Sequence, residues 1–250
     1  MPHNMQRNQS FDTDFAAPTD LFAIAAAADE RAGFIMKTYL YVFGAIAAFI
    51  AIETALFTAV GGPEKMWAIV GPILATIPLG WLGVLVSFMV VAWIAEKWAM
   101  SNTRSAVQHA GLALYIVALS ILFLPLLCFA QMKGGPNTIL SAAMSTAGLF
   151  AMLTLAVFIT RKDFSFLKSS LTFGALAALG FIATAAVFKF ALGPIFMYAM
   201  IALFCGYILY YTSNILHHYR IGQHVAAALA LFASVMMLFW YILQLFMSRE

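Results

Sequence analysis

Long and predominantly apolar stretches constrain this chain more than any other feature. Two of them, Ile69–Trp93 and Val107–Ala130, exceed the roughly 20 residues that a helix needs to cross a hydrocarbon core of about 30 Å. The chain is 64% hydrophobic and 9% charged, whereas a soluble domain is about 45–50% apolar and about 25% charged. We therefore predict an integral membrane protein. Soluble enzymes, DNA-binding domains and disordered proteins are excluded, and a net charge of +3 without a basic stripe argues against a nucleic-acid partner.

The same stretches favour helices over a membrane β-barrel, whose strands alternate apolar and polar residues over about 10 positions. The predicted fold class is an all-α bundle of seven transmembrane helices. These helices cover residues 36–60, 68–94, 107–130, 138–160, 166–188, 193–216 and 224–247. They form one domain, 36–250, behind a tail of residues 1–35. Because the connections are short, we expect sequential helices to be antiparallel neighbours.

Glycine and proline mark several predicted helix ends, as in Gly61-Gly62-Pro63 and Gly193-Pro194. Pro72 and Pro78 lie inside the second predicted helix and are expected to kink it. A gating role and simple packing both remain open for this kink.

The basic residues predict the orientation of the bundle. Nine of them lie on the side of the amino terminus, and four lie on the other side. The nine are Arg7, Arg31, Lys37, Lys97, Arg104, Arg161, Lys162, Lys168 and Arg220, and the four are Lys65, Lys133, Lys189 and Arg249. Because loops that stay in the cytoplasm are enriched in Lys and Arg, we predict a cytoplasmic amino terminus and an external carboxyl terminus.

The first 35 residues do not have the basic start and short apolar core of a cleavable signal. We expect residues 1–20 to form a mobile cytosolic tail, either a handle for a partner or protease or an unselected flexible end. Leu21–Arg31 is compatible with a short interfacial helix, because apolar residues at its start are followed by Asp29-Glu30-Arg31.

Glu53 is the one charged residue placed deep inside a predicted span. An ionised carboxylate there costs about 2.5–3.5 kcal/mol on insertion scales, so we expect a neutral form or a hydrogen-bonding partner. Ser145, Thr146 and Tyr198 lie at matching depth. A proton- or cation-responsive site and a protonated acid between helices both remain open.

A second polar cluster lies at the cytosolic end of the sixth predicted helix, where Tyr210, Tyr211, Thr212, Ser213 and Asn214 follow one another. Gly206, Tyr210 and Asn214 share one helix face. Five polar side chains in a row need partners inside the bundle. We interpret the nearby His217, His218 and His224 as loop histidines, because their spacing matches no zinc pattern.

Small residues form a stripe on the seventh predicted helix, at Ala226, Ala230 and Ser234. Such a stripe lets another helix approach closely, and we expect the sixth helix to dock there. The sequence contains no catalytic triad, zinc-protease, P-loop or dinucleotide motif, so we predict no enzyme, no cofactor and no metal centre.

The order of these features resembles the Bax inhibitor-1 family, and in particular its bacterial YccA-like branch. The resemblance rests on Arg31 with Lys37-Thr38-Tyr39, on Gly206–Leu216 (GYILYYTSNIL) and on Ala227–Ser234 (AALALFAS). It implies a bacterial inner-membrane location.

The resemblance also implies a mechanism that this chain departs from. Family members include proton-sensitive calcium leak channels with an aspartate pair on helices six and seven. The first position corresponds to Tyr211 and the second to Ser234, with Ala230 matching another commonly acidic position, and none of the three is acidic here. The basic latch expected in helix two is also missing from residues 68–94.

Two functions follow as hypotheses. The first is a non-enzymatic modulator of an FtsH-type membrane protease, acting through protein–protein contacts that involve the tail. The second is a pH-sensitive calcium, cation or proton leak channel, with Glu53, Tyr210, Tyr211, Asn214 and Ser234 as pore or proton-site candidates.

Overall fold

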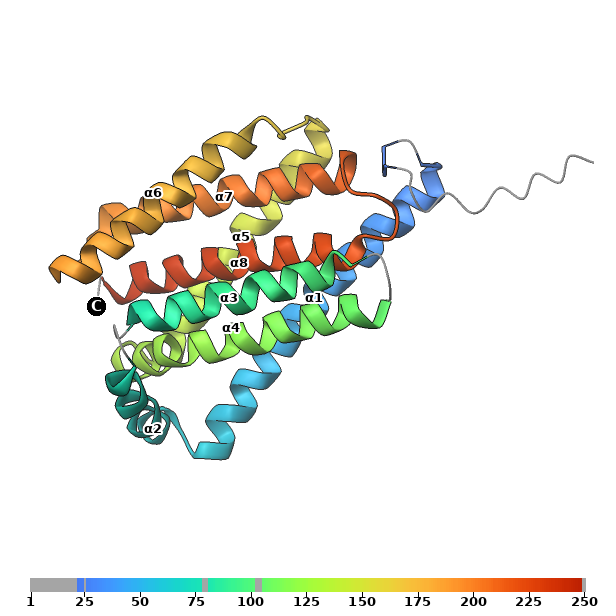
Figure 1. Cartoon of the computed structure of the whole chain (residues 1–250). Coiled ribbons are helices and arrows are strands. Elements are labelled where there is room, and N and C mark those ends of the chain that lie inside the picture. The colour runs from blue at the N-terminus through green and yellow to red at the C-terminus, as the bar shows by residue number, and fades with distance from the viewer. Residues whose placement is uncertain (1–21, 25, 78–80, 102–104, 249–250) are drawn as a thin grey trace, which may run out of the picture.

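The computed structural model describes residues 22–24, 26–77, 81–101 and 105–248. Those residues form eight helices arranged as one bundle (Figure 1). The helices are α1 (Ala28–Val60), α2 (Pro63–Thr76), α3 (Trp81–Ala99), α4 (Ser105–Lys133), α5 (Gly135–Thr160), α6 (Leu167–Phe188), α7 (Pro194–His217) and α8 (His224–Met247). Seven of them, all except α2, are long and apolar enough to cross a membrane. The predicted all-α bundle with seven spanning helices is therefore confirmed.

Helix α8 is the centre of the bundle. It packs against α1, α3, α4, α5 and α7, and it runs through the middle of the molecule in Figure 1. Phe232, Leu238 and Leu243 on this helix are fully buried. A helix that is apolar on all sides is stable when other helices surround it. At the end of α8, the Lys133 ammonium of α4 donates a hydrogen bond to the Met247 carbonyl over 2.6 Å.

The prediction of the second helix is wrong, because residues 68–94 do not form one kinked helix. Residues 68–76 belong to α2 and residues 81–94 to α3, and Ile77, directly after the end of α2, is extended (φ −71°, ψ 126°). The residue before a proline disfavours the helical region, and Pro78 follows Ile77. Helix α3 then continues to Ala99, so Glu96 and Lys97 belong to a spanning helix, where the prediction had left them in a connection.

Helix α1 begins at Ala28, earlier than the predicted start at residue 36. Asp29 and Glu30 occupy its first turn, where the helix dipole favours acidic side chains. The described part of Leu21–Arg31 differs from the predicted interfacial helix. Phe22 forms an antiparallel bridge with Arg220, and the Ala23 amide donates to the Tyr219 carbonyl over 2.9 Å. The chain before α1 is thus anchored on the α7–α8 connection.

Sequential helices are not all close neighbours, as the prediction had assumed. Helix α5 packs against α4, α7 and α8, whereas α6 packs mainly against α7. The α6–α7 contact is reciprocal, because a Cβ at Gly206 would lie 2.8 Å from Leu171 and one at Gly174 would lie 2.8 Å from Leu203. Gly206 was predicted as a helix-packing residue, and the helix that packs against it is α6 and not α8.

Helices α3 and α4 approach even more closely, at Gly111. A Cβ on this glycine would lie 2.5 Å from the Ala95 carbonyl oxygen and 2.7 Å from the Ala99 amide nitrogen. Backbone therefore meets backbone at this crossing, which fixes the position of the carboxyl end of α3.

Candidate functional site: a cavity between four helices

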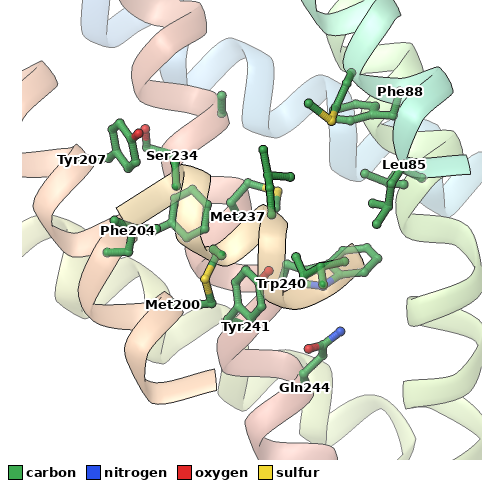
Figure 2. A pocket seen from close by; sticks show the side chains of 18 of the residues that line it. Leu85, Phe88, Met200, Phe204, Tyr207, Ser234, Met237, Trp240, Tyr241 and Gln244 are labelled. Carbon is green, nitrogen blue, oxygen red and sulfur yellow. The ribbon is translucent and has the colours of Figure 1, made fainter. Parts of the chain in front are cut away.

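A cavity of about 670 Å³ lies between α3, α6, α7 and α8, with contributions from α4. Figure 2 shows Leu85 and Phe88 of α3 on one side, and Met200, Phe204 and Tyr207 of α7 on the other. Helix α8 forms the floor between them. We call the end of the bundle that carries the start of α1 the amino-terminal end, and the other the opposite end. Ser234 and Tyr207 lie toward the amino-terminal end of the cavity, and Gln244 lies toward the opposite end (Figure 2).

Aromatic side chains form one wall of the cavity. Phe204 stacks on Tyr241 of α8, with centroids 5.8 Å apart, and lies 5.9 Å from Tyr207. Tyr207 in turn stacks on Tyr211 at 5.9 Å. The Tyr207 hydroxyl donates to the Leu171 carbonyl of α6 over 3.1 Å, which fixes the orientation of its ring. We call Phe204, Tyr207, Tyr211 and Tyr241 the aromatic wall.

Glu96 is the charged residue of the cavity lining. Its side chain is exposed, and the phenols of Tyr115 and Tyr211 line the same cavity. Tyr219 lies in the α7–α8 connection, and burial raises its pKa, with smaller effects from neighbouring tyrosines and from Glu96. The cavity lining thus combines one exposed acid with several phenols.

Helix α3 also carries a basic residue, which corrects the expectation that the second span has none. Lys97 is part of this helix. Its ammonium lies 3.8 Å from the centroid of the Trp93 ring, a cation–π contact. Lys97 does not line the cavity, whereas its neighbour Glu96 does.

The structure brings together some of the predicted site residues. Tyr211, Ser234 and Ala230 line the cavity, and the Ser234 hydroxyl donates to the Ala230 carbonyl over 2.9 Å. Tyr210 contacts Tyr211 edge to face, with centroids 5.1 Å apart.

Other predicted residues lie outside this lining. Asn214 is buried, and its carbonyl accepts the amides of His218 and Tyr219 at the end of α7. Ala226 is buried in the core. Helices α7 and α8 pack closely as expected, but two members of the small-residue stripe, Ala230 and Ser234, face the cavity.

Two residues of the polar run of α7, residues 210–214, are buried against other parts of the bundle. The Ser213 hydroxyl accepts the Phe164 amide over 2.9 Å and lies 3.3 Å from the Lys162 carbonyl. These contacts attach the α5–α6 connection to α7. Thr212 is buried near Tyr39 of α1 and Thr154 of α5, but its hydroxyl has no hydrogen-bond partner among the described residues. The polar run therefore holds several helices together, in addition to contributing Tyr211 to the cavity.

Glu53 lies apart from the cavity. It is 6% exposed on α1, and neither carboxylate oxygen has a hydrogen-bond partner among the described residues. The partners expected at matching depth do not bind it: Ser145 donates to the Ser141 carbonyl and Thr146 to the Ala142 carbonyl. Cys128 of α4 lies within range of electrostatic interaction with Glu53. The described cavity does not connect Glu53 with the polar run of α7.

The three histidines near the α7–α8 connection have separate contacts. His217 Nδ1 lies 3.0 Å from the Ser213 carbonyl, His218 pairs with Asp163 at 2.9 Å, and His224 packs against Tyr41. Each therefore has a local partner of its own.

Tyr41 also reaches His109, a residue that the sequence analysis did not single out. Its hydroxyl lies 2.6 Å from His109 Nε2, while Nδ1 lies 2.6 Å from the Ser105 carbonyl. A carbonyl only accepts, so Nδ1 carries the proton in the neutral ring and Tyr41 donates to Nε2.

Glu96 is the main residue of the cavity that the sequence did not reveal. The predicted second helix ended before it, so it was counted as a loop residue. The α7 side of the cavity did have a signal in the sequence. Large side chains recur there at intervals of three and four residues, which places them on one helix face: Phe196, Met200, Phe204, Tyr207 and Tyr211.

A central apolar helix, six further spanning helices and a cavity against that central helix define a polytopic helical membrane protein. A family model described as inhibitor of apoptosis-promoting Bax1 matches residues 31–250. The chain therefore belongs to the Bax inhibitor-1 family.

Relatives occur in plants, bacteria and yeast. The chain is 29% identical to Protein LIFEGUARD 4 of Arabidopsis thaliana over 230 residues, which cover 88% of this chain and 86% of that protein. It is 27% identical to the Pseudomonas aeruginosa protein PA2604 over 225 residues, or 89% and 93% of the two chains. A shorter match of 112 residues, 43% and 41% of the two chains, is 35% identical to Bax inhibitor 1 of Schizosaccharomyces pombe.

Proposed function

We propose that this Bax inhibitor-1 family protein provides a pH-sensitive leak pathway for calcium, other cations or protons. One observation carries the proposal: the cavity beside α8 is lined by Tyr211, Ser234 and the carboxylate of Glu96. The first two positions lack the acids that the family resemblance implied. Glu96 of α3 supplies a carboxylate to the same cavity from a different helix.

The charge of Glu96 determines whether cation flux through the proposed pathway rises or falls with pH. An ionised carboxylate at an exposed position of the cavity lining attracts cations. Protonation removes that charge. We therefore expect cation flux to decrease as the pH is lowered.

Reconstitution into liposomes loaded with a calcium dye tests the pathway. The wild-type protein should admit calcium faster than protein-free liposomes, and Ala230→Phe should abolish the difference, because Ala230 lines the cavity together with Tyr211 and Ser234. Gly148→Phe on α5 is the matched control, since nothing lies within 4 Å of a Cβ there. An absence of wild-type flux at every pH would rule out the proposal.

A second proposal is modulation of an FtsH-type membrane protease through the amino-terminal tail. Its structural support is the anchoring of Phe22 and Ala23 on the α7–α8 connection, which fixes the point where the tail leaves the bundle. Deletion of residues 1–20 should change the turnover of the protein or the activity of the protease. Unchanged values of both would reject this second role.

We further propose a bacterial inner-membrane location with a cytoplasmic amino terminus. The support is the distribution of basic residues, nine on the side of the amino terminus and four on the other. Alkaline phosphatase folds only outside the cytoplasm, so a fusion after Glu250 should be active and a fusion before Met1 inactive. The opposite pattern would reverse the orientation.

A further inference from the structure

The cavity is an elongated trench that opens toward the membrane. Between Phe196 and Tyr211 the α7 wall is about 22 Å long at about 1.5 Å per residue, which exceeds half of a hydrocarbon core of about 30 Å. Met89 of α3 and Leu179 of α6 belong to the lining and are nevertheless 48% and 40% exposed. They mark an opening between α3 and α6, through which a molecule dissolved in the bilayer can enter.

Most of the trench is apolar, and its surface suits a hydrocarbon chain. Met200, Leu203, Met237 and Trp240 are among the residues that line it. Methionine side chains adapt to ligands of irregular shape.

The amino-terminal end of the trench has the opposite character. Glu96 brings a negative charge there, and no Lys, Arg or His is found among the described residues that line the cavity. Tyr115, Tyr207 and Tyr211 line the same cavity, and tyrosine faces attract organic ammonium groups. Glu96 lies in the last turn of α3, where lipid headgroups meet water in a spanning helix. The phosphate of an anionic lipid would be repelled by this carboxylate.

We propose that the trench binds a long-chain organic cation taken from the bilayer, with its ammonium group beside Glu96 and the phenols and its hydrocarbon chain along Met200, Met237 and Trp240. This binding goes beyond the proposed leak pathway and does not depend on it. A bound amphiphile would occupy the same space as a passing ion.

Direct binding to the full-length protein in lipid nanodiscs tests the proposal, with radiolabelled hexadecyltrimethylammonium as the probe and protein-free nanodiscs as the partition control. We expect saturable binding at one site. Tetramethylammonium and hexadecanoate should compete poorly, because each lacks either the chain or the positive charge.

Two variants separate the two ends of the site. Glu96→Gln should weaken binding about tenfold, the size expected for loss of one charged contact, whereas Glu64→Gln on the exposed start of α2 should leave it unchanged. Ala178→Phe fills the trench from α6, so it should weaken binding of the hexadecyl probe more than that of octyltrimethylammonium. If Glu96→Gln fails to fold, this chain-length comparison decides. Equal affinity of wild type and Glu96→Gln, full competition by hexadecanoate, or equal loss of both chain lengths would overturn the proposal.

Discussion

At the scale of single residues, two acids of the spanning helices differ in their surroundings, because Glu53 is buried and Glu96 is exposed. Glu53 is enclosed by α1 and its neighbours without a hydrogen bond, while Glu96 faces a cavity rimmed by phenols. An unpaired buried polar group destabilises the folded state. We therefore assign the cation-attracting role to Glu96, and we expect Glu53 to lower the free energy of unfolding.

Replacement of Glu53 tests this assignment. Glu53→Leu removes an unpartnered polar group and should raise the free energy of unfolding by about 1–3 kcal/mol, measured as an increase in thermal midpoint in detergent. Glu64→Gln, on an exposed position of α2, should have little effect. A lower midpoint for Glu53→Leu would mean that the carboxyl has a stabilising partner.

Asp163 gives a pH-dependent prediction outside the spanning helices. The Ser165 amide donates to its carboxylate, and His218 adds a smaller effect, so the pKa of Asp163 lies below its usual value. A lowered folded pKa means that the ionised carboxylate stabilises the fold above the unfolded pKa of about 3.9. That contribution is lost as the pH falls through the folded pKa.

Asp163→Asn should therefore lower stability at pH 7 and have little effect near pH 3. Both partners of the Asp163–His218 pair are 46% exposed, so we expect a loss below about 1 kcal/mol. Thermal midpoints of the two proteins across this pH range measure it. A difference that stays the same at pH 3 and pH 7 would contradict the assignment.

At the scale of helices, the crossing of α3 and α4 controls one wall of the cavity. Gly111→Ala places a methyl group 2.5 Å from the Ala95 carbonyl, and overpacking of this kind typically costs about 1–3 kcal/mol. We expect a lower thermal midpoint and a displaced α3. Gly148→Ala adds the same methyl group in open space on α5 and should be neutral or slightly stabilising. Equal midpoints for the two variants would show that α3 and α4 separate easily.

Most helix positions were predictable, because apolar length and Gly-Pro turns are local properties of the sequence. The start of α5 after Gly134 and the start of α7 at Pro194 follow this rule. The break at Ile77 was harder to predict, since prolines inside membrane helices more often produce kinks when neighbouring helices satisfy the freed backbone groups. Extension of α3 past Trp93 depends on its contact with Gly111 of α4, which no local pattern reveals.

At the scale of the whole molecule, the bundle is organised around α8, and five helices pack on it. Hydropathy identified α8 as a span but did not distinguish it from helices that face lipid, since both are apolar. The cavity was only partly predictable for the same reason. Tyr211 and Ser234 could be proposed from their polarity, whereas the position of Glu96 depends on how α3 packs against α4 and α8.

The central claim is that this cavity is a cation pathway whose charge is supplied by Glu96. Calcium flux into dye-loaded liposomes at pH 7, compared for wild type, Glu96→Gln and the control Glu64→Gln, tests it most directly. The account predicts that wild type and Glu64→Gln conduct equally and that Glu96→Gln conducts several-fold less, with its remaining flux insensitive to pH. Equal flux and an equal pH response in all three proteins would contradict it.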